Sequence, residues 1–154
     1  MSDKEEFGED FRYLVRIANT DLDGKRSVVG ALAGIKGVNN RLSRVIATHA
    51  GVPKRERIGN LDDDSIDKLV ESLETVDEYA PTWMLNRRMD PESGEDIHLI
   101  GSEITLTLDE DINRLKKIKS WKGERHARNL PVRGQRTKSN GRTGATVGVQ
   151  RKKK

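Results

Sequence analysis

The segment from His126 to Gly144 constrains this chain most, because it cannot build a hydrophobic core. It shows neither a helical nor a strand period, and Leu130 and Val132 are its only large apolar residues. Ordering each residue costs about 1–2 kcal/mol of backbone entropy, which so little apolar surface cannot offset. Its basic residues, with no acid among them, are Arg128, Arg133, Arg136, Lys138 and Arg142. The sequence therefore predicts a tail that is disordered alone and becomes ordered against nucleic acid.

Charge is distributed very unevenly along the chain. Residues 113–154 hold 15 of the 29 Lys and Arg but only one of the 25 acids, Glu124; residues 1–112 hold the other 14 basic and 24 acidic residues. A block of like charge at one end is typical of an interaction tail, and neutralising several phosphates makes binding steeply salt-dependent. A purely solubilising tail is the alternative. It is disfavoured because it would rarely contain Trp121, the apolar run at residues 130–132 and spaced glycines.

The composition limits the size and the class of the fold. Of 154 residues, 33% are hydrophobic and 35% are charged, which predicts one modest domain with a small core and a tail. The absence of cysteine excludes disulfides, zinc ribbons and thiol catalysis. No run approaches the ~18 apolar residues of a membrane span, and residues 1–6 contain no apolar signal region. We therefore expect no membrane partner and a cytoplasmic location.

Apolar periodicity predicts a helical body at residues 11–120, between a flexible N-terminus at residues 1–10 and an extended tail at residues 121–154. Helices are expected over residues 25–33, over about 40–50, after a cap at Asp62, and after a capping box at 107–110. The clearest helical stripe is Ile66, Leu69, Val70 and Leu73.

Other parts of the body are predicted to be non-helical. Residues 11–17 alternate apolar and basic side chains, which indicates a short extended segment, and residues 19–24 are expected to form a turn. Residues 82–104 are predicted to form a β-hairpin with its loop near 90–95. His98 lies between two apolar residues of this hairpin and is therefore expected to face solvent.

The segment Gly34–Val38 is short, contains two glycines and separates two predicted helices. Such glycines let a backbone approach a phosphate closely, and the N–H groups at the start of the second helix point outward. Lys36, Arg41 and Arg44 lie beside this start. An ordinary helical hairpin that packs on its own core explains the pattern equally well, because glycines are common at such turns.

The sequence contains no assembled catalytic or metal site. Its three histidines have no paired ligand spacing, and no nucleophile elbow, Walker loop or dinucleotide fingerprint occurs. Four aspartates between residues 62 and 67 are explained better by a helix start than by a metal site. The Asp-x-Asp-Gly ending at Gly24 resembles part of a calcium loop, but Gly30 stands where that loop needs Glu. We expect no catalytic residue, no metal and no cofactor.

Trp121 lies among Lys119, Lys122 and Arg125 at the base of the tail. It either stacks on a base or sugar, as aromatic side chains do on single strands, or packs against the last predicted helix. Packing is slightly favoured. Better candidates for phosphate contacts are the cations without a neighbouring carboxylate, namely Arg133, Arg136, Lys138 and Arg142.

The run from Arg128 to Thr137, Arg-Asn-Leu-Pro-Val-Arg-Gly-Gln-Arg-Thr, closely resembles the signature of the universal small-subunit ribosomal protein number thirteen family. Gly34–Val38 is similar to the family's helical hairpin, and Ile58–Leu61 to the approach to its third helix. The resemblance covers roughly residues 11–144. Residues 82–104 resemble the archaeal and eukaryotic version, because the short bacterial form lacks them.

This resemblance implies a mainly α fold: a helix–two-turns–helix body with a small β-hairpin insertion and a long extended basic C-terminal tail. It implies a place in the head of the small ribosomal subunit, bound to ribosomal RNA and beside head protein number nineteen. Bridges to large-subunit proteins and a tail tip near peptidyl-site transfer RNA follow as well. The expected RNA-binding residues are Lys36, Gly37, Arg41, Arg44, Lys122, Arg125, His126, Arg128, Arg133, Gly134, Arg136, Thr137, Lys138, Asn140 and Arg142. Those expected near the transfer RNA are Arg151, Lys152, Lys153 and Lys154.

Two other classes of function compete with this interpretation. Some DNA glycosylases share the helix–two-turns–helix, but residue 2 here is Ser rather than their Pro nucleophile, and no cysteine zinc finger is present. A nucleoid-packaging protein suits the basic tail, whereas the acidic excess of residues 1–112 disfavours it. Preference for structured RNA over duplex DNA at equal salt would separate the ribosomal interpretation from both.

Overall fold

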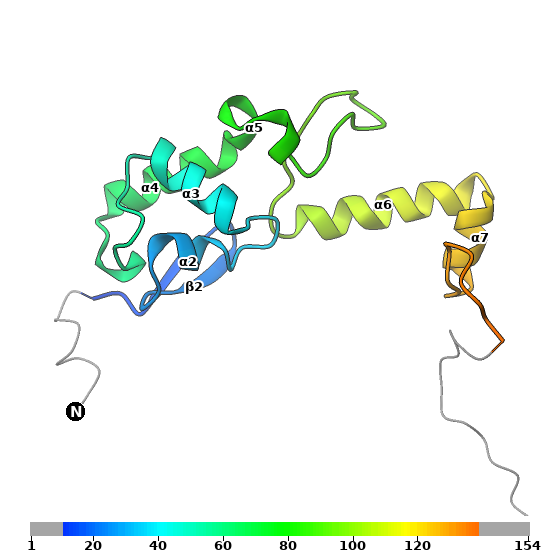
Figure 1. Cartoon of the computed structure of the whole chain (residues 1–154), viewed down its shortest axis with the longest axis horizontal. Coiled ribbons are helices and arrows are strands. Elements are labelled where there is room, and N and C mark those ends of the chain that lie inside the picture. Colours follow the sequence, from blue (N-terminus) through cyan, green and yellow to red (C-terminus); the bar gives the residue numbers. More distant parts are fainter. Residues whose placement is uncertain (1–10, 139–154) are drawn as a thin grey trace, which may run out of the picture. The chain divides into compact units, whose positions relative to one another are not determined.

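Residues 11–138 are described by the computed structural model (Figure 1). The chain forms two compact units, Met1–Leu106 and Thr107–Lys154. As predicted, the fold is mainly helical. Among the described residues it contains one small antiparallel hairpin, which lies at residues 14–23 rather than in the predicted insertion at residues 82–104. Within the described range, no helix is long and apolar enough to cross a membrane.

A two-stranded antiparallel hairpin opens the first unit. β1 (Leu14–Ile17) pairs with β2 (Thr20–Asp23), and Val15 lies opposite Leu22. Both of these side chains are buried. The alternation of buried and exposed positions in β1 follows from the two-residue period of a strand with one face on the core. The predicted extended segment is therefore confirmed.

The turn of this hairpin lies earlier than predicted. Ala18 and Asn19 connect the strands with φ angles of 47° and 57°, and two positive φ values are what a type I′ turn requires. Residues 20–23 form the second strand, so the prediction of a turn over residues 19–24 is wrong in extent. The sequence Asp-Leu-Asp-Gly suits a turn locally, but pairing with β1 and burial of Leu22 decide its conformation.

The three helices predicted for the first part of the body are present as α2 (Val28–Leu32), α3 (Asn40–His49) and α4 (Asp63–Glu74). The additional short elements are η1 (Ile58–Asn60), α5 (Val76–Tyr79) and η2 (Thr82–Met84). Three or four residues are too few to show an apolar period, so sequence periodicity does not reveal them.

Apolar side chains from these elements meet in one core. Its fully enclosed members include Val28, Leu32, Ile46, Ile58 and Leu69. Burying a side chain of this size contributes roughly 1.5–3 kcal/mol relative to leaving it exposed. Every buried hydrophobic side chain of residues 11–138 lies in the first unit. The described part of the second unit therefore has no hydrophobic core of its own.

Residues 82–104 reverse direction without forming strands. Arg87 and Ile97 make one isolated antiparallel bridge, where the hairpin prediction expected two paired strands. Beyond the bridge, the Asn86 side chain replaces a backbone partner: its Nδ2 donates to Leu99 O at 2.8 Å and its Oδ1 accepts from Leu99 N at 2.9 Å. Because a side chain occupies these backbone groups, the ladder does not extend.

The loop predicted near residues 90–95 is organised by Asp90. Its Oδ2 accepts hydrogen bonds from Glu92 N at 3.1 Å and Ser93 N at 3.0 Å, and Arg87 Nε pairs with its other oxygen. The hydrogen bond from Ser93, followed by that from Arg87, holds the pKa of Asp90 well below its ordinary value. An aspartate that bonds the backbone two and three residues ahead is a common way to close a turn.

The predicted fourth helix is present as α6 (Glu103–Lys117), but it begins earlier than expected. Gly101 adopts a left-handed φ of +61°, and Leu106 N donates to Ser102 O at 3.1 Å. The chain reversal at this glycine starts the first helical turn. The predicted capping box at residues 107–110 consequently lies inside the helix, and its assignment as a helix start is wrong.

Gly59 permits a close backbone contact that holds the N-terminal strand. Arg12 N donates to Gly59 O at 3.0 Å, and a Cβ on Gly59 would lie 2.3 Å from Arg12 O. We expect Gly59→Ala to lower the free energy of unfolding by about 1–3 kcal/mol, because the backbone must shift. Urea denaturation of both proteins measures this. Asn60→Ala, at an exposed position of the same turn, is the control and should stay within about 0.5 kcal/mol. Equal stability of the two variants would contradict the contact.

Candidate nucleic-acid interface

The second unit contains a short helix where an extended tail was predicted. α7 (Trp121–Ala127) is capped by Ser120, whose Oγ accepts a hydrogen bond from Gly123 N at 3.1 Å and donates one to Leu115 O at 3.0 Å. A Cβ on Gly123 would lie 2.2 Å from Leu115 O. Only glycine lets α7 pack this closely on the end of α6. The prediction of an extended tail is therefore wrong for residues 121–127.

Three of the predicted RNA-binding residues, Lys122, Arg125 and His126, lie on α7. The chain folds back along this helix: Arg125 Nε donates to Pro131 O at 3.1 Å, and Leu130 N donates to Arg125 O at 2.9 Å. The first bond holds the Arg125 side chain against the returning segment, and the second ties the backbone of that segment to α7. α7 and the segment after it thus present their cations from a defined local structure.

One carboxylate stands among these cations. Glu124 is the only acid between residues 113 and 138, and its Oε2 lies 3.1 Å from Arg128 Nη2. Both side chains are substantially exposed, so this pair contributes little to stability. A single carboxylate offsets one cation, and residues 113–138 keep a large positive excess.

Residues 128–138 form neither helix nor strand, as predicted. Asn129 and Gly134 turn the chain with φ angles of 52° and 76°, and Arg133 N donates to Gln135 Oε1 at 2.9 Å. The predicted RNA-binding residues in this stretch are all exposed: Arg128, Arg133, Gly134, Arg136, Thr137 and Lys138. The other predicted tail residues lie outside the described range, namely Asn140, Arg142, Arg151, Lys152, Lys153 and Lys154.

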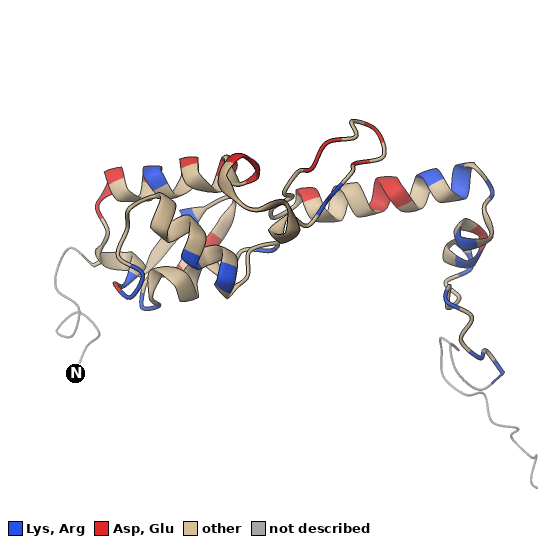
Figure 2. Ribbon diagram, turned by 45° about the horizontal axis from the view of Figure 1, so that its top comes forward, with Lys and Arg blue, Asp and Glu red and all other residues tan. Residues whose placement is uncertain are grey.

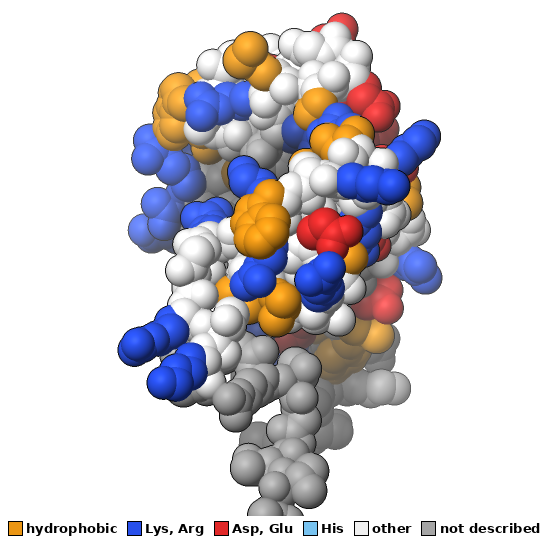
Figure 3. Space-filling view, turned by 90° about the vertical axis from the view of Figure 1, so that its right-hand side faces the viewer, with side chains coloured by type: hydrophobic (Ala, Val, Ile, Leu, Met, Phe, Trp, Pro, Cys, Tyr) orange, Lys and Arg blue, Asp and Glu red, His pale blue; other side chains and the backbone are white. Residues whose placement is uncertain are grey.

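Charged side chains are segregated along the chain. In Figure 2, the ribbon is red for Asp and Glu along α4, on α5, in the loop before α6 and in the middle of α6, whereas the end of α6 and α7 are mostly blue for Lys and Arg. Figure 3 shows orange hydrophobic side chains exposed between blue Lys and Arg side chains, with few red ones. A surface of cations and exposed apolar groups suits a polyanion that carries flat bases.

The glycine hairpin between α2 and α3 packs against its own chain. Gly37 has a φ of +96°, and a Cβ there would lie 2.6 Å from Leu99 O and 2.8 Å from Ile104 Cδ1. Its carbonyl accepts a hydrogen bond from His98 Nε2 at 3.2 Å. The close approach that this glycine permits is therefore made by residues 98–104. This favours the ordinary packing explanation over a phosphate contact at Gly37 itself.

The cations beside this hairpin differ in their surroundings. Lys36 Nζ donates to Thr105 Oγ1 at 3.1 Å, and the Arg41 guanidinium lies 4.7 Å from the centre of the Trp83 ring. Arg44 is exposed on α3. Two of the three predicted cations thus already contact their own chain. Trp83 was missed by sequence reasoning, because nothing in the order of residues brings it to Arg41.

The start of α3 also offers fewer open donors than expected. The Asn39 side chain accepts a hydrogen bond from Asn40 N at 2.7 Å, which satisfies one of the N–H groups at the helix start. Asn39 is therefore the N-cap of α3. The same bond removes a donor that the sequence interpretation assigned to phosphate.

His98 does not face solvent as predicted; it is half buried against the glycine hairpin. Asn86 N donates to its Nδ1 at 3.3 Å, which leaves Nε2 to carry the proton and to donate to Gly37 O. Burial lowers the pKa of His98, while the bond to Gly37 and the charge of Asp77 oppose this shift. Strand alternation failed here because residues 97–100 are not a strand: Ile100 packs against the core, and His98 bonds the glycine hairpin.

The contribution of His98 to the stability of the fold should decrease on acidification. An ordinary His pKa is about 6.5. Because the pKa of His98 in the folded protein lies below this value, the unfolded chain takes up a proton on His98 before the folded protein does, and acidification lowers the stability. We therefore expect the stability advantage of the wild type over His98→Gln to shrink between pH 7.5 and pH 5.5. Urea denaturation of both proteins at the two pH values measures it. An advantage that grows on acidification would contradict a lowered pKa.

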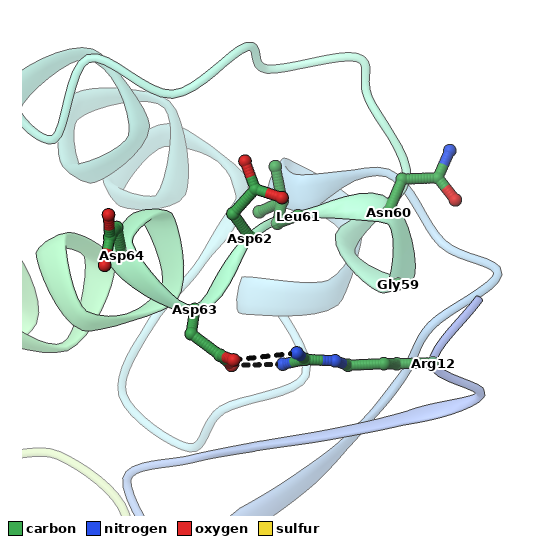
Figure 4. A pocket seen from close by; sticks show the side chains of 7 residues that line it. All are labelled: Arg12, Gly59, Asn60, Leu61, Asp62, Asp63 and Asp64. Carbon is green, nitrogen blue, oxygen red and sulfur yellow. Dashed lines mark hydrogen bonds and ion pairs between the residues drawn. The ribbon is translucent and has the colours of Figure 1, made fainter. Parts of the chain in front are cut away.

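The acidic start of α4 forms a separate pocket with Arg12 (Figure 4). Arg12 makes a bidentate pair with Asp63, with Nη2 and Oδ2 2.9 Å apart, while Asp62 and Asp64 point elsewhere. The hydrogen bond from Arg12 lowers the pKa of Asp63. Asp62 occupies the N-cap position of α4, as predicted, but its side chain makes no cap hydrogen bond.

These aspartates do not converge on a common point. Among residues 11–138 there is no group of three or more His, Cys, Asp or Glu side chains placed to hold a metal ion. An acidic pocket also repels phosphates, which leaves the basic surface of the second unit as the better candidate for a nucleic-acid interface.

The sequence matches proteins of one family over most of its length. The family model described as "Ribosomal protein S13/S18" matches residues 16–143. A protein of Methanocella arvoryzae named "Small ribosomal subunit protein uS13" is 54% identical over 145 residues, which cover 94% of this chain and 65% of that protein. Proteins of the same name from Methanococcoides burtonii and Methanothermobacter thermautotrophicus are 52% and 50% identical and are covered over 98% and 99% of their lengths.

These matches include both the basic segment after α7 and the glycine hairpin. They cover the first and the second unit alike, apart from the first 15 residues and the last 11. All three relatives come from archaea, which agrees with the form indicated by residues 82–104. The chain therefore belongs to the ribosomal protein S13/S18 family, in its archaeal small-subunit form.

Proposed function

We propose that this protein is a structural, non-catalytic component of the head of the small ribosomal subunit and that it binds ribosomal RNA through its second unit. The observation that carries the proposal is the group of cations on α7 and on the segment after it, most of which are exposed, with Glu124 as the one acid among residues 113–138. Membership of a ribosomal family supports the ribosomal location.

The proposed binding is mainly electrostatic. Arg133, Arg136 and Lys138 are exposed along an irregular segment whose backbone can follow an RNA strand. Guanidinium groups bind phosphate oxygens in a bidentate manner, and each neutralised phosphate releases counterions. Ordering this segment costs entropy that its few apolar contacts cannot offset. The RNA therefore supplies the free energy that holds it in one conformation.

The first unit contributes less RNA contact in this proposal. Lys36 and Arg41 already bond or stack within their own chain, and Gly37 is occupied by residues 98–104. Arg44 remains a candidate phosphate ligand at the exposed side of α3. The body then serves chiefly to place the second unit against RNA.

Protein and transfer-RNA contacts form the rest of the proposal. By family resemblance, neighbours are head protein number nineteen, bridge proteins of the large subunit and peptidyl-site transfer RNA. The second unit supplies a surface for a protein neighbour, because Leu108 on α6 and Ile118 directly after that helix are exposed and exposed apolar groups commonly mark interfaces. Residues 151–154, proposed to approach the transfer RNA, lie outside the described range.

Removing two tail cations should weaken RNA binding in a salt-dependent manner. We expect Arg133→Ala combined with Arg136→Ala to bind archaeal small-subunit ribosomal RNA more weakly and to reduce the slope of log affinity against log salt by about 2. Filter binding at several salt concentrations measures both quantities. The matched control is Arg16→Ala with Lys68→Ala, which removes the same charge from exposed positions of the first unit. An unchanged slope in the tail variant would exclude these two phosphate contacts.

The ribosomal location is tested in the cell. After sedimentation of lysate through a sucrose gradient in magnesium, we expect the protein to migrate with the small subunit and the whole ribosome, and to be released by high salt or by RNase. A peak at the top of the gradient that RNase does not change would overturn the proposal. Tighter binding to duplex DNA than to structured RNA at equal salt would then favour the DNA-binding alternative.

A further inference from the structure

The side chain of Trp121 is 75% exposed, although it is the largest apolar group of the second unit. The sequence interpretation slightly favoured its packing against α6, and this exposure contradicts that preference. Tryptophan is seldom left this open in a chain without a partner, because its ring has a large apolar area to bury. Its position therefore calls for a ligand with a flat apolar surface.

The backbone that carries Trp121 is held firmly. It is the first residue of α7, directly after the Ser120 cap, whose hydroxyl bonds both Gly123 N and Leu115 O. Gly123 sits so close to Leu115 O that no side chain fits between them. These contacts fix where the indole emerges from the chain and prevent α7 from rolling to bury it.

Positive charge surrounds this ring. The Arg125 guanidinium lies 5.8 Å from the centre of the indole, and its Nε is anchored by Pro131 O at 3.1 Å. Lys119 and Lys122 flank Trp121 in the sequence and are exposed. The single nearby acid, Glu124, pairs with Arg128. An apolar protein partner would have to desolvate these cations, which is costly, whereas a nucleotide offers a base to the ring and a phosphate to the charges.

We propose that Trp121 is a stacking platform for an unpaired base of RNA, with Arg125 positioned to contact the adjoining phosphate. This inference rests on the proposed RNA binding. It adds a stacking contact with the base, which does not depend on the charge of the phosphates. Trp83 provides the contrast. It is less exposed, at 58%, and the Arg41 guanidinium lies closer to its ring centre, at 4.7 Å, than the Arg125 guanidinium lies to that of Trp121.

Probes that differ only in their bases test the platform. The full-length protein is titrated with an adenylate 12-mer and with an abasic ribose-phosphate 12-mer of equal charge, at fixed salt. Stacking on an aromatic ring makes binding about 5- to 150-fold tighter per base. We expect the wild type to prefer the adenylate probe by a factor in this range, and Trp121→Ala to bind both probes equally with an unchanged salt slope.

Two variants control this experiment. Trp121→Tyr keeps an aromatic ring and should retain most of the preference, and Trp83→Ala removes the other exposed tryptophan and should retain all of it. In Trp83→Phe, where Trp121 is the only indole, the adenylate probe should quench the fluorescence and the abasic probe should not. Because Trp121 is exposed, its replacement leaves the fold intact, which circular dichroism verifies.

The outcomes separate this inference from the function on which it rests. If the wild type and Trp121→Ala bind archaeal small-subunit ribosomal RNA equally and show the same preference for bases, the platform is excluded while RNA binding stands. If the wild type itself fails to bind that RNA, the proposed function fails and the platform with it. If Trp121→Ala loses the base preference while Trp83→Ala and Trp121→Tyr keep it, the platform is supported.

Discussion

The shortage of apolar residues governs how this chain is divided. The buried hydrophobic side chains of residues 11–138 all lie between Phe11 and Leu85, and nearly all of them join one core in the first unit. α6 buries none of its residues, and α7 buries only Gly123. A segment that buries no large apolar group gains little to offset its conformational entropy. The described part of the second unit is consequently held by short-range hydrogen bonds, such as those of Ser120. Most of its cations are exposed, as are the apolar side chains of Leu108, Ile118 and Trp121.

The two basic regions differ for the same reason. In the first unit, folding onto the core brings residues 98–104 against the glycine hairpin, so that Lys36 bonds Thr105 and Gly37 contacts Leu99. In the part of the second unit from residue 113 to residue 138, Glu124 is the one acid among many Lys and Arg residues, so this stretch keeps a large net positive charge. A cation that already has a partner gains less from a phosphate than one surrounded by water and like charge. The fold thus concentrates the capacity for RNA binding in the second unit, whereas the glycine hairpin mainly makes packing contacts within the first unit.

Sequence reasoning succeeded where a local pattern decides the structure. α3, α4 and α6 follow the apolar spacing that predicted them, because a stripe of such residues forms a helix face in many tertiary settings. Sequence reasoning failed where a hydrogen bond to a residue distant in the sequence determines the local structure. Asn86 took the backbone groups of Leu99 that would have extended a strand ladder, and His98 turned inward to bond Gly37. α7 was missed because seven residues carry little periodicity and its packing depends on one glycine meeting the end of α6.

By itself, the sequence determined the helical class, the separation of acidic from basic halves, the family and the segment that suits RNA, since all of these depend on composition, short-range order or a contiguous motif. Only the tertiary structure decided which cations are engaged and which are exposed, how Gly37 is used, and that Trp121 stands open beside Arg125. The physical reason is that exposure and pairing depend on which residues folding brings together, and these contacts span separations that no local pattern encodes.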